Sequence, residues 1–364
     1  IDFLFKKNKV ESIYGIAKIL SSNQINIKLN DGSEKLIEAK NIVIATGSES
    51  ASLNGIEVDE KKIVSSTGAL SLEKIPEHLT IIGGGYIGLE LGSVWSRLGS
   101  KVTVIEYLDR IAPGLDGELS SEFQKILKRQ GIDFIVGAKV TGVEEKSDGL
   151  SVQIENVSSG EISTLDSSVV LLSTGRIPNT TGLFDDDLGI QLNEKGFIKT
   201  DKNYRTDVEG VWAIGDVIEG PMLAHKAEEE GVAVAELIKG KPGHVNYNII
   251  PSVIYTNPEV ASVGLTEEQL NESGTGYKVG KFPFLANGRA KVNKATDGFV
   301  KILSSDETDQ ILGVHIIGSQ AGTMIAEVAV AMEFEATAED CSQICHAQPT
   351  LSEEIKAASW ASDK

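Results

Sequence analysis

Three glycines, at positions 83, 85 and 88, have the spacing of a loop that holds the pyrophosphate of a dinucleotide. Gly83 permits a tight turn, Gly85 lets the backbone approach the pyrophosphate, and Gly88 lets the next helix pack closely on the strand. Glu106 follows Gly88 by 18 residues, where an acid can hydrogen-bond both ribose hydroxyls. Because a carboxylate there repels a 2′-phosphate, the pattern favours NAD(H) over NADP(H).

The flanking sequence supplies the elements that such a loop needs. An apolar strand over 79–82 precedes the loop, and a second one over 102–105 ends at Glu106. The helix between them would present unpaired N–H groups and its positive dipole end to an anion. A GxGxxG motif with strand, helix, strand and terminal acid in register predicts a nucleotide site. The alternative is an α/β turn that binds no nucleotide.

Three further apolar strands end in small or acidic residues. The segments over 41–48 (NIVIATGS) and 168–175 (SVVLLSTG) both end in a Thr-Gly pair, and 211–214 runs into Gly215 and Asp216. An acid at the carboxyl end of a strand can hold a ligand hydroxyl. Asp216 could equally be the N-cap of a helix.

Helical and strand patterns also mark the rest of the chain. Apolar residues at i, i+4, i+7 and i+8 predict a helix over 118–129, and 10–19 and 24–29 are expected to be strands. From 248 to 364, strands alternate with helices, and the helix over 321–334 carries an apolar side. That side, which includes Met324, Val328 and Met332, predicts either an oligomer interface or an internal core.

Composition excludes several classes of partner. The 364 residues include 34 basic and 53 acidic ones, a net charge of −19, which disfavours nucleic acid and anionic membranes. No apolar run reaches the roughly 18 residues of a membrane helix, and no cluster of residues indicates a metal site. The two cysteines, Cys341 and Cys345, fit a reducing compartment. We therefore expect a cytoplasmic protein, or one of the mitochondrial matrix if eukaryotic.

Several motifs taken together resemble one family. They are ATGS at 45–48, GGGYIGLELG at 83–92, STGRIPN at 173–179, AIGD at 213–216 and PTLSEE at 349–354. In this order they resemble the flavin-dependent pyridine-nucleotide disulfide oxidoreductases, and among these the dihydrolipoamide dehydrogenase family. The resemblance covers essentially the whole chain.

The resemblance implies an α/β fold in which a three-layer, Rossmann-like NAD domain is inserted in a partial FAD domain. An α+β dimerisation domain follows at the C-terminus. The expected boundaries are 1–50 for the remaining FAD domain, 51–183 for the NAD domain, 184–247 for a second FAD or central segment and 248–364 for the dimerisation domain. A homodimer through 248–364 is implied, with dihydrolipoamide or a lipoyl-bearing protein as the other partner.

The resemblance also implies two sets of cofactor residues. The NAD set consists of Gly83, Gly84, Gly85, Tyr86, Ile87, Gly88, Leu89, Glu90, Glu106, Val140 and Gly175. The FAD set consists of Ala17, Thr46, Gly47, Ser48, Asp216, Met222, Leu223, Ala224 and His225. Asp216 would hold a hydroxyl of the flavin chain, and 222–225 would lie beside the isoalloxazine.

The sequence departs from the family first in its redox residues. The family's flavin pyrophosphate loop and its Cys-x4-Cys pair are absent from 1–364. Cys341 and Cys345 lie i, i+4 on an expected helix, where their Cβ vectors suit a disulfide poorly. They also belong to the wrong domain to face the nicotinamide. We interpret both as core or surface thiols.

The second departure concerns the catalytic base. The family has a His immediately before the Pro of PTLSE, paired with the Glu that ends this motif. Here those positions are Gln348 and Glu353. Thiol–disulfide exchange needs a thiolate, and an amide with no titratable proton near neutral pH cannot generate one. His346 is the alternative base, but in an extended turn it would face a different direction.

The expected function is therefore that of a dihydrolipoamide dehydrogenase homologue. The family reaction converts dihydrolipoamide and NAD+ to lipoamide and NADH through FAD and a disulfide. Residues 1–364 as they stand are expected to bind NAD(H), to hold FAD weakly or not at all, and to lack lipoamide turnover. One alternative is a diaphorase- or transhydrogenase-like flavoprotein that works without the base. Another is a non-catalytic dimeric remnant.

Overall fold

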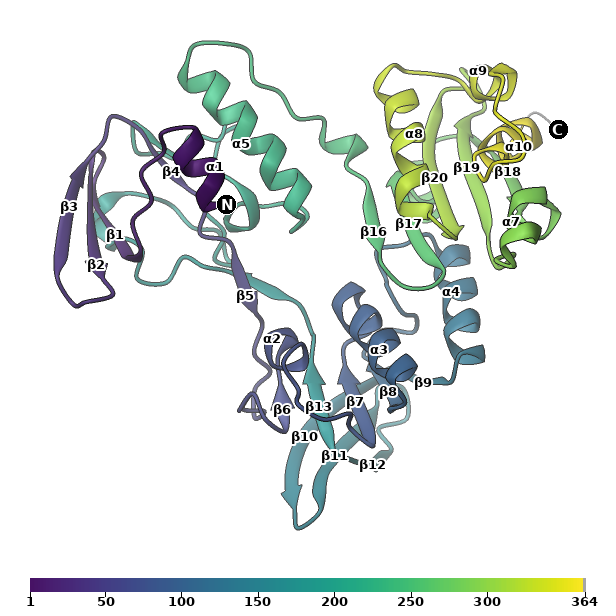
Figure 1. Ribbon diagram of the computed structural model, residues 1–364, viewed down its shortest axis with the longest axis horizontal. Helices are drawn as coiled ribbons and strands as arrows, with labels where there is room; N and C mark the ends of the chain where they lie inside the picture. The colour runs from purple at the N-terminus through teal and green to yellow at the C-terminus, as the bar shows by residue number, and fades with distance from the viewer. Residues whose placement is uncertain (363–364) are drawn as a thin grey trace. The chain divides into compact units, whose positions relative to one another are not determined.

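The computed structural model describes residues 1–362, which divide into two compact units. Unit 1 comprises Ile1–Glu49 and Arg176–Val245, and unit 2 comprises Ser50–Gly175 and the chain from Asn246 onward. The chain therefore enters unit 1, builds the first part of unit 2, returns to unit 1 and ends in unit 2 (Figure 1).

Unit 1 combines a small meander with a pair of parallel strands and one long helix. Its elements are α1 (Asp2–Lys7), β1 (Gly15–Ser21), β2 (Gln24–Leu29), β3 (Glu34–Glu38), β4 (Ile42–Ile44), β5 (Ser48–Ser50), β14 (Arg176–Pro178), η1 (Asp186–Leu188), β15 (Val211–Ala213), η2 (Gly215–Val217) and α5 (Ala224–Ile238). Strands β1, β2 and β3 form the antiparallel meander, and β4 pairs in parallel with β15.

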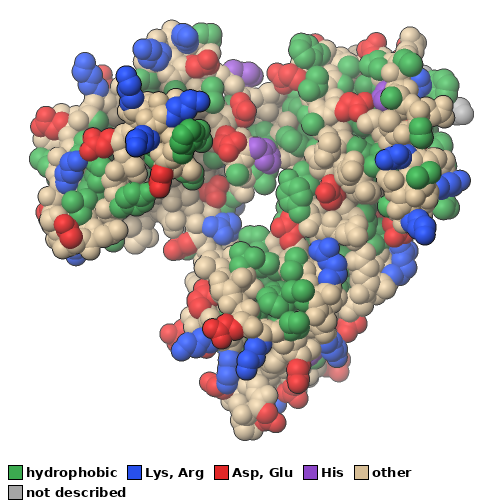
Figure 2. Space-filling model, viewed as in Figure 1, with side chains coloured by type: hydrophobic (Ala, Val, Ile, Leu, Met, Phe, Trp, Pro, Cys, Tyr) green, Lys and Arg blue, Asp and Glu red, His purple; other side chains and the backbone are tan. Residues whose placement is uncertain are grey.

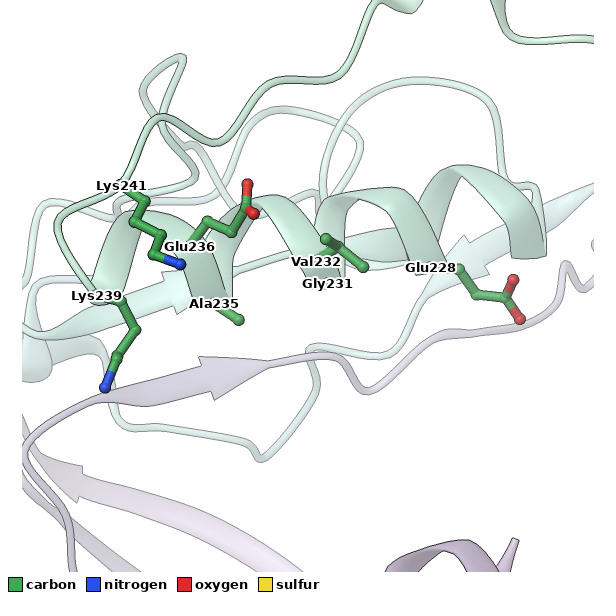
Figure 3. A pocket seen from close by; sticks show the side chains of 7 residues that line it. All are labelled: Glu228, Gly231, Val232, Ala235, Glu236, Lys239 and Lys241. Atoms are coloured by element: carbon green, nitrogen blue, oxygen red, sulfur yellow. The ribbon is translucent and has the colours of Figure 1, made fainter. Parts of the chain in front are cut away.

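Helix α5 covers the core of unit 1 with one face only. Ala233 and Val234 are buried in that core, whereas Val232 is 59% exposed. Figure 3 shows the outer face, where Val232 lies in an apolar strip between Glu228 and the lysines at 239 and 241.

The first part of unit 2 is a parallel sheet in the order β6-β13-β7-β8-β9. Its elements are β6 (Ile63–Val64), α2 (Ser66–Ala69), β7 (His78–Ile82), α3 (Tyr86–Leu98), β8 (Lys101–Glu106), α4 (Gly117–Arg129), β9 (Ile132–Val136), β10 (Ala138–Lys146), β11 (Gly149–Asn156), β12 (Ile162–Ser167) and β13 (Val169–Leu172). The chain runs outward from β7 to β8 and β9 and then crosses back to β13 on the other side of β7. The strand order reverses between β7 and β13, where open α/β sheets bind their ligands.

Alternation along these strands produces three layers. Ile81 and Val104 face a cluster that contains the α3 and α4 side chains, whereas Ile82 and Ile105 face a second cluster. The second cluster includes side chains from the antiparallel meander of β10, β11 and β12, such as Val152. The sheet therefore lies between helices and a meander, because successive side chains of a strand point to opposite faces.

The last part of unit 2 is an antiparallel sheet in the order β16-β17-β20-β19-β18. Its elements are η3 (Tyr247–Ile249), β16 (Ser252–Ile254), β17 (Glu259–Gly264), α6 (Glu267–Ser273), β18 (Tyr277–Pro283), η4 (Phe284–Ala286), α7 (Gly288–Asn293), β19 (Phe299–Ser305), β20 (Ile311–Gly318), α8 (Ala321–Glu333), α9 (Ala338–Gln343) and α10 (Glu353–Ser362). Phe299 and Ile317 of this sheet belong to the same buried cluster as Phe123 of α4. The two parts of unit 2 therefore share a core.

The structure agrees with the predicted helix over 118–129 but only in part with the predicted strand over 10–19. The helix predicted over 118–129 is confirmed as α4, whose N-cap Asp116 accepts hydrogen bonds from the N–H groups of Glu118 and Leu119. The strand predicted over 10–19 was wrong in its first half, since β1 begins only at Gly15. The residues before Gly15 are largely exposed and gain nothing from sheet pairing.

The apolar side of the helix over 321–334 was expected to be either an oligomer interface or an internal core. Met324, Val328 and Met332 of α8 are buried in the core of unit 2, so that side is internal. Val330 and the following Phe334 are 59% and 81% exposed, so part of the apolar surface faces outward.

Charges of both signs occur on the face of the molecule that Figure 2 shows. On the face shown in Figure 2, acidic and basic side chains are interspersed over each unit. Within residues 1–362, no helix combines the length and apolarity needed to cross a bilayer.

Candidate nucleotide-binding sites and the C-terminal loop

The glycine loop joins β7 to α3 at the point where the strand order reverses. Gly83 has φ +107°, and a Cβ there would lie 2.4 Å from the carbonyl oxygen of Ser173. A Cβ on Gly88 would lie 2.3 Å from the carbonyl oxygen of Gly83. By contrast, nothing lies within 4 Å of a Cβ built on Gly85, so the N-terminus of α3 is open to a ligand. These surroundings fit a pyrophosphate.

Glu106 lies beside this loop at the end of β8. Its Oε2 accepts a hydrogen bond of 2.6 Å from the N–H of Gly84, and its Oε1 accepts one of 2.9 Å from the N–H of Leu108. The side chain is only 9% exposed. The carboxylate therefore fixes the turn, a role that the sequence did not reveal, and it retains lone pairs for a ribose hydroxyl.

Other residues of the expected NAD set differ in their access to a ligand. Gly84, Tyr86 and Ile87 lie in the loop and the first turn of α3, but Leu89 is fully buried in the core. Glu90 accepts a hydrogen bond of 2.8 Å from the N–H of Tyr255, and burial raises its pKa despite this bond.

Two residues of the set come from later strands. Val140 lies on β10 and packs on the cluster between sheet and meander. Gly175 follows β13 with φ +132°, and its carbonyl oxygen accepts a hydrogen bond from Ala51.

Arg176, Ser48 and Asp216 form a hydrogen-bond chain in unit 1. Ser48 Oγ donates to Asp216 Oδ2 at 2.5 Å, and Arg176 Nε donates to Ser48 Oγ at 2.6 Å. Thr46 Oγ1 donates to the carbonyl oxygen of Asn179 at 2.7 Å, beside Gly47. Sequence reasoning missed Arg176 and Asn179, although both lie in the STGRIPN motif. Ala17 lies on β1, exposed and opposite Ile27.

Asp216 is not a helix N-cap. It lies inside the short 3-10 helix η2, and the N-cap of α5 is Leu223, which makes no side-chain cap. Met222, Ala224 and His225 lie around the start of α5. The N-cap interpretation of Asp216 was therefore wrong.

A buried ion pair fixes the backbone next to Asp216. Lys226 Nζ lies 3.1 Å from Glu230 Oε1, and both side chains are fully buried. Glu230 Oε2 accepts from the N–H of Gly215 at 2.7 Å, and Lys226 Nζ donates to the carbonyl oxygen of Gly215 at 3.0 Å. Sequence reasoning missed this pair, because Glu230 ends a run of three acids that is typical of an exposed helix face.

The C-terminal loop leaves Gln348 exposed. Glu353 Oε2 accepts a hydrogen bond of 2.9 Å from the N–H of Thr350, so this carboxylate caps the turn into α10. The Nε2 atom of His346 lies 2.8 Å from Glu327 Oε1, and its Nδ1 atom lies 3.1 Å from the carbonyl oxygen of Ile344. Both ring nitrogens therefore lie at hydrogen-bond distance from oxygen atoms of the chain itself.

A cavity of about 430 Å³ lies beside this loop and includes Gln348, Glu353 and Glu354 in its lining. Glu354 is 1% exposed, and its Oε2 has no hydrogen-bond partner among the residues described. Burial and the neighbouring charge of Glu353 raise the pKa of Glu354 to about 7, although a hydrogen bond with Asn287 opposes the shift. The sequence alone did not single out this carboxyl group.

The two cysteines are free and lie in different environments. Cys341 is buried, which raises the pKa of its thiol to about 11, whereas Cys345 is exposed. Helix α9 ends at Gln343, so the expectation that one helix carries both cysteines was wrong.

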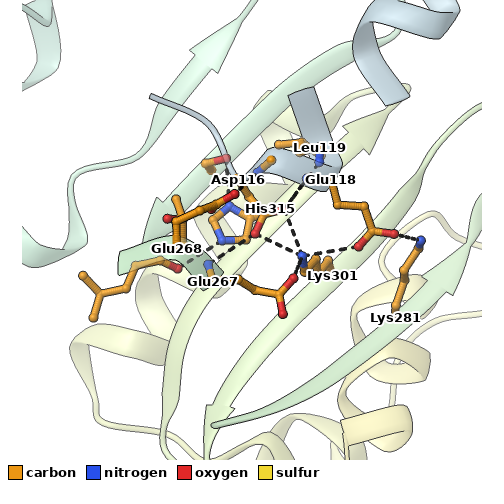
Figure 4. A network of polar contacts seen from close by, with 12 residues as sticks. Asp116, Glu118, Leu119, Glu267, Glu268, Lys281, Lys301 and His315 are labelled. Carbon is orange, nitrogen blue, oxygen red and sulfur yellow. Dashed lines mark hydrogen bonds and ion pairs between the residues drawn. The ribbon is translucent and has the colours of Figure 1, made fainter. Parts of the chain in front are cut away.

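One cluster of carboxylates has the composition of a metal site, namely Asp116, Glu118 and Glu267. Figure 4 shows that Lys301 projects into the middle of this cluster. Its Nζ lies 2.9 and 3.0 Å from the two carboxylate oxygens of Asp116, 3.3 Å from Glu118 Oε2 and in contact with Glu267. The ammonium group thus supplies the positive charge, and the arrangement is an ion-pair network.

A glycine loop at the switch point of one parallel sheet, a second pair of parallel strands and a C-terminal antiparallel sheet form the arrangement expected of a two-cofactor oxidoreductase. The family profile described as pyridine nucleotide-disulphide oxidoreductase matches residues 1–231, and the profile of that family's dimerisation domain matches 250–359. The chain belongs to the pyridine nucleotide-disulphide oxidoreductase family. It is an oxidoreductase by family, and both the expected α/β class and the C-terminal dimerisation domain are confirmed.

Curated relatives agree with this assignment. The mitochondrial dihydrolipoyl dehydrogenase of Pisum sativum is 51% identical over 99% of this chain and 72% of its own length. Dihydrolipoyl dehydrogenase 3 of Pseudomonas putida is 52% identical over 100% of this chain and 78% of its own length. Leghemoglobin reductase of Glycine max is 51% identical over 99% of this chain and 69% of its own length. The resemblance to dihydrolipoamide dehydrogenases is confirmed.

Solved structures show the same fold. The copper(II) complex of the HOCl-induced flavoprotein disulfide reductase RclA from Escherichia coli superposes with a TM-score of 0.89 at 28% identity. That match covers 99% of this chain and 82% of the other. LpdA from Mycobacterium tuberculosis superposes with a TM-score of 0.86 at 26% identity, over 96% and 74% of the two chains.

Proposed function

We propose that this chain provides the NAD(H) site and the dimerisation domain of an oxidoreductase of the dihydrolipoyl dehydrogenase type. Its substrate would be dihydrolipoamide or a lipoyl-bearing protein. The observation that carries the proposal is the glycine loop at the switch point, with Gly85 open and Glu106 hydrogen-bonded to Gly84. The pyrophosphate would bind the N–H groups at the start of α3, and Glu106 would bind the ribose.

The flavin site would be built from the hydrogen-bond chain of unit 1. Asp216 would accept a hydrogen bond from a hydroxyl of the flavin side chain. Ser48 would orient its carboxylate, and the buried pair of Lys226 and Glu230 would hold the backbone at Gly215 beside it. Met222 and His225 would lie beside the flavin ring. Hydride transfer is the chemistry that FAD and NAD supply when bound. Residues 1–364 alone would hold FAD weakly, because they lack the family's flavin pyrophosphate loop.

The catalytic position is occupied by Gln348, with Glu353 five residues later. An amide can orient a substrate but cannot remove a thiol proton. His346 does not replace the base in this conformation, because both of its nitrogens are engaged. This engagement favours the second candidate function, a diaphorase-like transfer of electrons from NADH to an acceptor that needs no base.

The proposal also covers the domain limits, the oligomeric state and the location of the protein. We place the domain limits at 50, 183 and 247, with a homodimer through 248–364 supported by the match to the dimerisation domain. The mitochondrial relatives support a location in the mitochondrial matrix if the organism is a eukaryote. For any other organism we propose the cytoplasm.

The test measures lipoamide turnover in protein that carries the family's Cys-x4-Cys segment ahead of residue 1. Gln348→His should raise NAD+-dependent oxidation of dihydrolipoamide by about a hundredfold, the usual contribution of a positioned base. Gln343→His, on the exposed end of α9, is the matched control and should change nothing. Turnover of dihydrolipoamide by residues 1–364 alone, or no gain in the Gln348→His variant, would contradict the assignment of position 348.

A further inference from the structure

Unit 1 contains a cavity of about 580 Å³ away from its flavin-side residues. The cavity is lined in part by Ser22, Lys40, Asn41, Arg205, Glu209 and Trp212. Asn41 and Gly210 immediately precede β4 and β15, whereas Gly47 and Asp216 follow the same two strands. The cavity therefore lies at the opposite end of this strand pair from the proposed flavin site.

Two basic residues, Arg205 and Lys40, line this cavity. The Arg205 guanidinium lies over the indole of Trp212, 5.2 Å from the ring centroid, and Trp212 is 6% exposed. Stacking of this kind orients the planar guanidinium and leaves its N–H groups for a ligand. Within the described chain, neither Arg205 nor Lys40 has a carboxylate at ion-pair distance.

A third donor is oriented by the same indole. Trp212 Nε1 donates a hydrogen bond of 3.2 Å to Asn41 Oδ1. Because an indole N–H can only donate, the amide oxygen of Asn41 must face it, and the amide NH2 group must face away. The cavity thus offers a guanidinium, an ammonium, an amide NH2 and the hydroxyl of Ser22, against a single carboxylate, Glu209.

We propose that this cavity binds a phosphate-bearing small molecule. A phosphate accepts two parallel hydrogen bonds from a guanidinium, and an ammonium group such as that of Lys40 attracts it as well. The volume falls within the range of small-molecule sites, and Asn41 and Ser22 would bind hydroxyls of the ligand. Oriented donors lower the entropic cost of binding, since Arg205 and Asn41 are already held by Trp212.

The test is a calorimetric titration of the purified chain with inorganic pyrophosphate, with NADH present at saturation to occupy the glycine loop. We expect saturable binding that weakens about tenfold or more in Arg205→Gln and in Lys40→Gln, because each loses a hydrogen bond to a charged group. Lys28→Gln is the matched control, since Lys28 lies near the far end of the β1–β2 hairpin, roughly 16 Å along the strand from the turn. This variant should bind as the parent does.

Three outcomes would overturn the proposal. They are no saturable heat at millimolar pyrophosphate, equal affinity in all variants, and binding of citrate as tight as that of pyrophosphate. Arg205→Gln could disturb Trp212, so its melting temperature is measured alongside. The Lys40 side chain makes no hydrogen bond or ion pair within residues 1–362 that its replacement would break. If Arg205→Gln unfolds, the affinity of Lys40→Gln for pyrophosphate therefore tests the proposal.

Discussion

Residue 348 has a side chain that can form hydrogen bonds but cannot accept a proton from a thiol. In the loop around Gln348, Glu353 accepts a hydrogen bond from the N–H of Thr350, and His346 lies at hydrogen-bond distance from Glu327. The resemblance to the family places a His at this position, and Gln348 has an amide in its place. A binding role for Gln348 is therefore compatible with the structure, and a proton-accepting role is not.

Glu354 is the titratable group whose state should change near neutral pH. Its pKa is about 7 in the folded protein against an ordinary value of 4.5, so burial of the ionised form costs stability. The cost is absent below about pH 4.5, grows between pH 4.5 and 7, and is constant above. Glu354→Gln should therefore stabilise the protein relative to the parent by an amount that rises over this window to at most about 3 kcal/mol.

Denaturant unfolding of both proteins at pH 5, 6, 7 and 8 measures this difference. Glu272→Gln, at an exposed position on α6, should show no such pH dependence. A difference that shrinks as the pH rises would refute the assignment of the shift to Glu354.

At the scale of elements, the sequence predicts what is local and misses what is distant. The β7–α3–β8 unit was predicted because its apolar periodicity, its glycines and its terminal acid all lie within 28 residues, 79–106. The network of Lys301 was missed because Asp116 and Lys301 are 185 residues apart. The sequence FVKILSS gives no sign that its lysine is fully buried.

The same limit explains the other misses at the site. The pairing of Lys226 with Glu230 is local at i, i+4, but only the packing of α5 shows which acid of the run is buried. The bond between Ser48 and Asp216 joins residues 168 positions apart, so no periodicity predicts it.

Lys301 should be important for the attachment of α4 to β19 within unit 2. Burial by itself would raise the pKa of Asp116, but the hydrogen bonds and charge of Lys301 lower it below its ordinary value. Lys301→Met would leave this carboxylate buried and unpaired, which should cost about 3 kcal/mol of unfolding free energy at pH 7. Chemical denaturation gives the value directly.

Two further variants test whether burial of the charge causes this loss of stability. Lys281→Met removes a half-exposed partner of Glu118 and should cost under about 1 kcal/mol. Adding Asp116→Asn to Lys301→Met should recover part of the loss, because no charge then remains buried at that position. Equal losses in Lys301→Met and Lys281→Met would show that burial of the network is unimportant.

We expect the exposed apolar residues at the end of α8 to contribute to the interface of a dimer. The chain carries the family's dimerisation domain, and Phe334 and Val330 are the exposed apolar side chains at the end of this helix. We expect a dimer in solution, and Phe334→Glu should weaken it at least about tenfold by placing a charge in the interface. Sedimentation at micromolar concentration measures the change.

Val157→Glu tests whether any exposed apolar-to-acidic change has this effect. Val157 is 43% exposed and lies between β11 and β12, outside residues 250–359. The dimer should persist in this variant. Dissociation by Val157→Glu, or none by Phe334→Glu, would place the interface elsewhere.

The loop from Gly83 to Gly88, with Glu106, is the NAD(H) site that we propose. The most direct measurement is a fluorescence titration of the purified chain with NADH and with NADPH, repeated on Glu106→Gln. We expect the parent chain to bind NADH at least about tenfold more tightly than NADPH. In Glu106→Gln the difference between the two affinities should be smaller, because the repulsion of the 2′-phosphate is lost. Equal binding of the two nucleotides by the parent chain, or binding of neither, would contradict it.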